Sequence, residues 1–124
     1  MNFPMLMLIL ATVALTAFGQ LALKLGVMGA PVRSAAERGV FAFLFAAAAS
    51  PAVWAGLAIY TAGVVLWLWI LSKTELSLAY PFLGIGFLIT MILGMVVLHE
   101  GVTPLRIAGT VLISVGCVLV ARSV

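Results

Sequence analysis

The chain has 124 residues, of which 66% are hydrophobic and only 7% are charged, and its formal net charge is +3. Soluble domains carry roughly 25% charged residues, so this composition excludes a soluble globular domain and predicts an all-α integral membrane protein. Six basic residues do not suggest a nucleic-acid-binding patch, and a single cysteine excludes an intrachain disulfide.

Four apolar runs are long enough to cross a bilayer, which takes about 20 helical residues. The first run lacks the basic leader of a signal peptide and is too long for its apolar segment. We therefore predict a single transmembrane domain over residues 1–124, with four membrane-spanning helices. The runs are Met5–Leu25, Ala52–Leu71, Leu78–Leu98 and Pro104–Val120.

The first predicted helix carries four polar side chains, Thr12, Thr16, Gln20 and Lys24, each four residues from the next. Steps of four residues drift by only about 40° around a helix, so these groups form one slowly turning stripe. In one interpretation the threonines bond to carbonyls of their own helix and Lys24 extends to the nearby interface. In the other, the polar stripe faces a partner helix or a hydrated groove, and the confinement of the polar groups to one face favours this second interpretation.

The segment between the first two spans is predicted to be a short interfacial or re-entrant helix. "SAAE" at Ser34–Glu37 has the pattern of a capping box, with a serine at the cap and a glutamate three positions later. The apolar run Val40–Ala49 that follows is too short to span the membrane. A membrane-surface anchor is the simplest interpretation of this segment.

The second predicted helix places Gly56, Tyr60, Gly63 and Trp67 on one face, at spacings of four, three and four. Small residues allow another backbone to approach, while the aromatic rings offer amphipathic surface. For Trp67, a place in the aromatic belt at the lipid headgroups is the alternative.

The second and third predicted helices are joined by a short polar turn, "SKTELS" at Ser72–Ser77. Pro81 is expected in the first turn of the third helix, where a missing N–H is tolerated. Glu100 follows the end of that helix, and a solvated turn carboxylate is the simplest interpretation of it. Thr103 is expected to cap the fourth helix. Gly109 and Gly116 share one face of that helix and suit close helix packing, either within the chain or between two chains.

Motifs that carry enzyme chemistry are missing. The sequence has no Gly-rich phosphate loop and no metal-ligand spacing, and its one histidine, His99, has no second His or Cys near it. We therefore expect no catalytic residues, no metal and no cofactor, and we expect a transporter or a structural subunit rather than an enzyme.

The size and the order of motifs resemble a known family. "GQLALKLG", "GLAIYTAGVVLWLWILSKTELSLAYPFLGIGF", "HEGVTPLRIAG" and "LISVG" are together similar to the aminoarabinose-phosphoundecaprenol flippase subunits and to related EamA-type small transporters. These belong to the small multidrug resistance superfamily, whose members are four-helix proteins that work as dimers. The resemblance implies a multi-pass protein of the bacterial inner membrane, working as a homodimer or as a heterodimer with a related small subunit.

The resemblance also implies the cargo, an anionic polyprenyl-phosphate lipid that carries a sugar. Lys24 would then meet the phosphate near the headgroup level, and Gln20 would bond the sugar or the phosphate from one turn deeper. Glu100 would pair with an amino group on the sugar or with a basic side chain. The full set of expected substrate-binding residues is Lys24, Gln20, Thr16, Tyr60, Trp67, Tyr80 and Glu100, and Gly109 and Gly116 are expected at a dimer interface.

Two alternatives to the flippase remain open from the sequence. The drug exporters of the superfamily carry a glutamate in the middle of helix one, whereas this sequence has no acidic residue there. That departure counts against an exporter of amphipathic compounds. The other alternative is a non-transporting subunit of a membrane complex.

Overall fold

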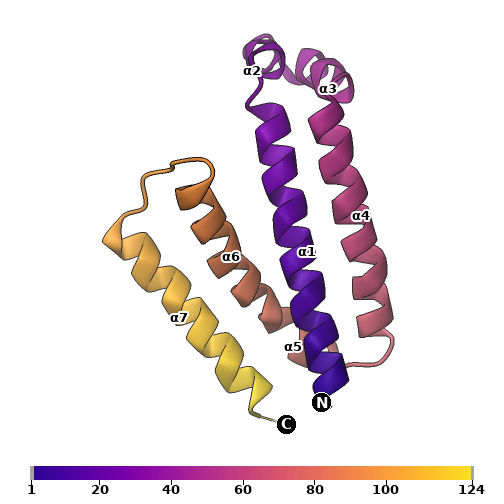
Figure 1. Ribbon diagram of the computed structural model, residues 1–124, viewed down its shortest axis with the longest axis vertical. Coiled ribbons are helices and arrows are strands. Elements are labelled where there is room, and N and C mark those ends of the chain that lie inside the picture. Colours follow the sequence, from indigo (N-terminus) through magenta and orange to yellow (C-terminus); the bar gives the residue numbers. More distant parts are fainter. Residues whose placement is uncertain (1, 124) are drawn as a thin grey trace.

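The computed structural model describes residues 2–123, and every regular element in that range is a helix. Within these residues, four helical segments are long and apolar enough to cross a membrane, which confirms the predicted all-α fold with four spans (Figure 1). Consecutive spans run in opposite directions. The start of the first span and the end of the last span therefore lie at the same end of the bundle. The spans are α1 (Phe3–Val27), α4 (Pro51–Leu71), the segment Leu76–Val96 and α7 (Pro104–Ala121).

Within the described range, three of the long helices begin at polar caps, and at α4 the side chain of Ser50 accepts a hydrogen bond from the Val53 amide at 3.5 Å. The side chain of Asn2 accepts a hydrogen bond from the Met5 amide at 2.9 Å and starts α1. Thr103 accepts from the Arg106 amide at 3.1 Å, so the predicted cap of the last helix is confirmed. Each cap satisfies an amide that the first turn of a helix leaves without an internal partner.

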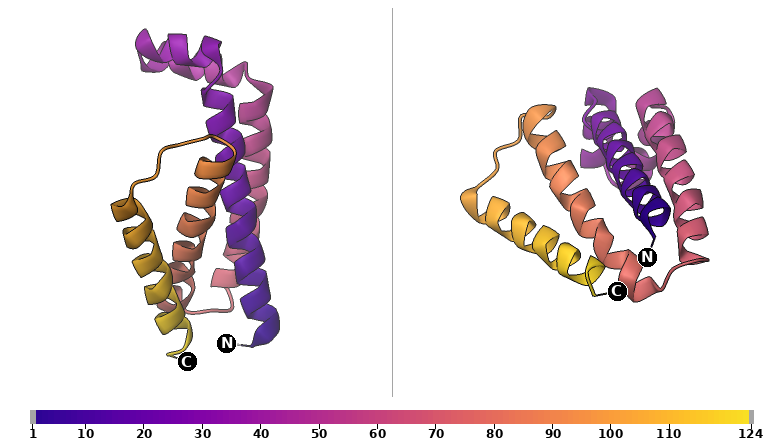
Figure 2. Two further views of the ribbon diagram at one scale, coloured as in Figure 1. Left: turned by 60° about the vertical axis from the view of Figure 1, so that its left-hand side comes forward. Right: turned by 60° about the horizontal axis from the view of Figure 1, so that its bottom comes forward.

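The segment between α1 and α4 forms two short helices, α2 (Ala30–Glu37) and α3 (Val40–Ala48), which lie across the ends of α1 and α4 (Figure 2). The expected short helix outside the spans is therefore present, but its predicted start is wrong. Ser34 lies inside α2, which begins one turn earlier with Pro31 in its first turn. Gly39, at φ 120°, breaks the helix between α2 and α3.

The third span also departs from the sequence prediction. It consists of α5 (Leu76–Ala79), a 3₁₀ turn η1 (Tyr80–Phe82) and α6 (Leu83–Val96). Pro81 therefore does not lie in the first turn of the span, as expected, but in the 3₁₀ turn that interrupts it. Because proline has no amide to donate, the tighter turn accommodates it without a missing bond in the middle of an α-helix.

Helices α1 and α4 form the closest pair, because glycines on both helices remove the side chains between them. A Cβ built on Gly56 would lie 2.7 Å from the backbone nitrogen of Leu23, and one on Gly19 would lie 3.1 Å from that of Tyr60. A Cβ on Gly63 would overlap the methyl group of Thr16. We call this contact the glycine seam, and it confirms that the glycine face of the second predicted helix meets another backbone.

The hydrophobic core lies at the end of the bundle that holds the chain termini. Ile9 and Ile70 are fully buried there, and Phe82 and Cys117 are nearly so. Away from this end, α6 and α7 lean apart from α1 and α4 (Figures 1 and 2). The core therefore closes the bundle at one end, whereas α6 and α7 diverge from α1 and α4 toward the other end.

Candidate functional site

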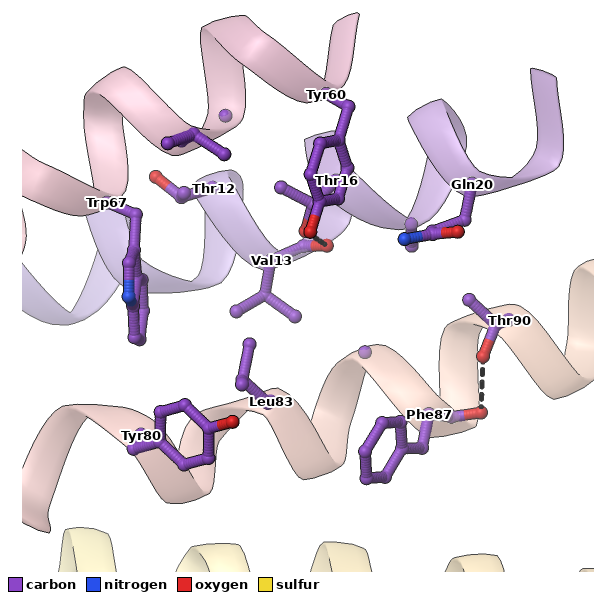
Figure 3. Close-up of a pocket in the computed structure, with 14 residues that line it drawn as sticks. Thr12, Val13, Thr16, Gln20, Tyr60, Trp67, Tyr80, Leu83, Phe87 and Thr90 are labelled. Atoms are coloured by element: carbon purple, nitrogen blue, oxygen red, sulfur yellow. Dashed lines mark hydrogen bonds between the residues drawn. The ribbon is translucent and has the colours of Figure 1, made fainter. Parts of the chain in front are cut away.

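An open groove occupies the space between α1, α4 and α6. Its deeper part, which we call the inner groove, has a volume of about 370 Å³ (Figure 3). Three members of the polar stripe, Thr12, Thr16 and Gln20, line it from α1. The stripe therefore faces a cavity and not only lipid.

The hydroxyl groups of the two threonines are already bonded within α1. Thr12 donates to the carbonyl of Leu8 at 2.8 Å, and Thr16 donates to that of Val13 at 2.9 Å. Both interpretations of the stripe thus describe part of the structure, because these side chains bond to their own helix and also line the groove. Each hydroxyl oxygen keeps lone pairs that can accept a bond from a ligand.

Aromatic rings form the other walls of the inner groove. Tyr60 and Trp67 extend into it from α4, and Tyr80 and Phe87 reach it from the third span (Figure 3). Tyr80 belongs to the 3₁₀ turn that contains Pro81. The tyrosine and tryptophan rings combine an apolar face with a polar group at the edge, which suits a sugar.

The groove continues into a second cavity of about 410 Å³, which we call the groove mouth. Gln20 and Thr90 line both cavities, so the two spaces adjoin. Lys24 lines the mouth from α1, and Glu100 lines it from the turn after α6. Lys24 and Glu100 are exposed, and no salt bridge joins charged side chains in the described range 2–123. One cation and one carboxylate thus border the same space without neutralising each other.

The structure places all seven residues expected to bind substrate around these two adjoining cavities. Their roles stay predictions, because position alone does not establish binding. Four line only the inner groove, Gln20 lines both cavities, and Lys24 and Glu100 line only the mouth. The four are Thr16, Tyr60, Trp67 and Tyr80.

The two glycines expected at a dimer interface lie elsewhere, on α7. A Cβ built on Gly109 or Gly116 would have nothing within 4 Å. Close packing within the chain therefore does not explain these two glycines, in contrast to Gly56 and Gly63 in the glycine seam. Most of α7 is exposed, including Leu112 at 70%.

Sequence reasoning missed Thr90 and Gly94, which line the groove from α6. Thr90 donates to the carbonyl of Phe87 at 3.0 Å, in the same manner as the threonines of α1. A signal was available, since Thr90 is the one threonine in the third apolar run. Gly94 gave no such signal, because glycines also occur at other positions of that run.

The closed end of the bundle holds a separate polar cavity of about 570 Å³, bordered by Lys73 and Glu75. The Lys73 ammonium lies 4.7 Å from the centre of the Trp69 ring, a cation–π contact. Lys73 is therefore a useful comparison for Lys24, because it is a lysine outside the groove. Within residues 2–123, no group of three or more His, Cys, Asp or Glu side chains could hold a metal ion.

Similar proteins are known from several pseudomonads. A protein of Pseudomonas syringae pv. syringae (strain B728a) is 35% identical over 108 residues, which cover 87% of this chain and 92% of that protein. A protein of Pseudomonas aeruginosa (strain UCBPP-PA14) is 36% identical over 116 residues, which cover 94% of this chain and 96% of that protein. Each bears the name "Probable 4-amino-4-deoxy-L-arabinose-phosphoundecaprenol flippase subunit ArnE". No protein-family model matches the chain, and no solved structure matches it.

Proposed function

The chain belongs to the ArnE family of flippase subunits, and on that premise we propose that it helps to move a polyprenyl-phosphate-linked amino sugar across the bacterial inner membrane. The observation that carries this proposal is the groove, which joins a polar stripe and aromatic walls to a cation at its mouth. The family membership agrees with the resemblance found in the sequence motifs.

The groove offers a different kind of contact for each part of such a lipid. Lys24 is the contact for the phosphate, because an ammonium offers three donors and a compact charge. Gln20, one turn deeper, donates to the phosphate or the sugar. Tyr60, Trp67 and Tyr80 pack on the sugar or bond to its hydroxyls. The prenyl tail stays in lipid between the helices.

The exporter alternative has less support. Helix α1 carries no acidic residue that could bind a proton and a cationic drug in turn. The groove side of α1 instead presents threonine, glutamine and lysine side chains. An anionic cargo fits this set of groups better than a cationic one.

We further propose that the working unit contains a second chain, either another copy or a related small subunit. The relatives are named as subunits, and α7 leaves its small residues Gly109 and Gly116 uncovered. Small residues on an exposed face allow the close helix contacts that hold membrane proteins together.

The test is lipid binding and flipping by the full chain in vesicles, with undecaprenyl phosphate carrying 4-amino-4-deoxy-arabinose as the probe. Losing one charge-assisted contact costs about 1.5–3 kcal/mol, which is roughly tenfold or more in affinity. We expect that loss for Lys24→Ala, a smaller loss for Lys24→Arg and the mildest effect for Gln20→Ala.

Lys73→Ala is the matched control, because it removes a lysine at the opposite end of the bundle. It should bind the lipid as the wild type does. Equal binding by Lys24→Ala and wild type would show that Lys24 is only an interfacial anchor. Transport of cationic drugs by a wild type that ignores the lipid would favour the exporter.

A further inference from the structure

The turn after α6 has an unusual backbone path that fixes the position of Glu100. The Glu100 amide donates to the carbonyl of Gly94 at 2.9 Å, a bond that closes a wide turn. His99, just before it, has φ 55° and is the one residue other than glycine in 2–123 with a positive φ. Residues other than glycine adopt this conformation at a cost, so the surrounding turn must hold it.

The carboxylate of Glu100 lies directly against α6 at Gly94. A Cβ built on Gly94 would overlap Oε1 of Glu100 and would lie 3.3 Å from its Cδ. Gly94 is buried, although no other side chain crowds its Cβ position. Only glycine at position 94 therefore allows the carboxylate to occupy this place.

The chain's three acidic residues all lie within the described range 2–123, and of these only Glu100 borders the groove. The sequence contains Glu37, Glu75 and Glu100; Glu37 lies on α2 and Glu75 borders the cavity at the closed end. Arg106 donates from its guanidinium to the carbonyl of Gly101 at 3.4 Å, and no salt bridge joins it to Glu100 among the described residues 2–123. A carboxylate without an ion-pair partner in the described range therefore borders the groove mouth, which Lys24 also lines.

A lipid that carries a phosphate and a protonated amine would satisfy both charges at once. We propose that Glu100, held against Gly94, binds the ammonium group of the cargo's sugar while Lys24 binds its phosphate. This inference rests on the proposed function. It adds that the groove selects the cargo by the amine of its sugar. Gly94 is then a positioning residue, which acts through Glu100.

The experiment compares two probe lipids that differ in one group. Both are undecaprenyl phosphate esters, one of 4-amino-4-deoxy-arabinose and one of arabinose, which has a hydroxyl in place of the amine. Affinity is measured for the full chain in nanodiscs. We expect the wild type to prefer the amino lipid by roughly tenfold to a hundredfold, the effect of one hydrogen bond between charged groups.

Two variants separate charge from position. Glu100→Gln removes the charge at nearly constant size, and Gly94→Ala keeps the charge but displaces the carboxylate. Both should lose the preference for the amine and keep the affinity for the arabinose lipid. Gly101→Ala is the control, because a Cβ there meets nothing within 4 Å, and it should keep the preference.

Each result decides the inference. A wild type that binds both lipids equally, or a Glu100→Gln variant that keeps the preference, would overturn it while leaving the flippase proposal in place. A Gly94→Ala variant that keeps the preference would overturn the positioning role of Gly94. Binding of neither lipid by the wild type would overturn the proposed function, and this inference with it.

Discussion

A methyl group added at Gly63 should destabilise the bundle, and removing a methyl group from Thr16 should restore its stability. A Cβ on Gly63 would overlap Cγ2 of Thr16, while the next nearest atoms, Cβ and N of Thr16, lie at 3.6 and 3.8 Å, in ordinary contact. The methyl group of Thr16 is therefore the group that a side chain at position 63 would clash with. Thr16→Ser removes that methyl and keeps the hydroxyl that bonds to Val13.

The expected magnitudes follow from this geometry. Overpacking costs about 1–3 kcal/mol, and replacing glycine by alanine inside a helix returns about 1 kcal/mol. Gly63→Ala should thus cost about 0–2 kcal/mol in net terms. In the double variant the alanine methyl takes the place of the lost threonine methyl, so volume is conserved across the seam.

The assay is the free energy of unfolding in mixed micelles titrated with SDS, measured for the wild type, the two single variants and the double variant. The gain in helix propensity from Gly63→Ala is the same beside Thr16 and in the Thr16→Ser background, so it cancels between the two comparisons. The coupling energy therefore reports the clash alone. We expect coupling of about 1–3 kcal/mol in favour of the double variant. Ala62→Leu, on the exposed side of α4, should change stability by less than about 0.5 kcal/mol. Additive single effects would refute the close contact of α1 and α4 at this point.

Further predictions concern α7, the α2–α3 segment and Lys24. Gly116→Leu should weaken association between chains in detergent, because a large side chain would fill a face left open for a partner; an intact dimer carrying both Gly109→Leu and Gly116→Leu would remove α7 from the interface. Cysteines introduced at Ser34 and Ala49 should be labelled from the same side of the membrane, since α2 and α3 cross the ends of α1 and α4; labelling from opposite sides would make the segment a span. Lys24→Arg should keep part of the lipid affinity that Lys24→Ala loses, and identical losses would show that the geometry of the ammonium, not its charge, decides binding.

The sequence predicts the spans and the polar stripe well because their signals are local. A run of about 20 apolar residues has few structures open to it other than a membrane helix. The four-residue spacing of Thr12, Thr16, Gln20 and Lys24 places them on one face of any helix. The cap at Thr103 follows from the Thr-Pro pair in the same way.

Features that depend on contacts between distant residues could not be predicted. Apart from the polar stripe of α1, the spans are apolar on every side, so hydrophobic periodicity does not indicate which face meets which helix. The sequence therefore does not distinguish Gly56 and Gly63, which are closely packed, from Gly109 and Gly116, which are open. The contact of Glu100 with Gly94 depends on the turn at His99, which carries no recognisable turn motif.

Two local signals were present but misleading. "SAAE" matches a capping box, yet α2 begins earlier because Pro31 suits the first turn of a helix and needs no amide partner there. Pro81 was expected to mark the beginning of a helix, but Leu76 begins the span and the proline is accommodated by the 3₁₀ turn. In both places the chain contained two possible helix starts, and the structure uses the earlier one.

Mass spectrometry of the lipid that copurifies with the full chain tests the central claim most directly. The groove, with Lys24 at its mouth, should retain an anionic polyprenyl phosphate that carries a sugar. That lipid should be enriched over bulk phospholipid in the wild type and in Lys73→Ala, and depleted by roughly tenfold or more in Lys24→Ala. Recovery of bulk phospholipid alone, or equal recovery of the polyprenyl lipid from the wild type and Lys24→Ala, would contradict the account.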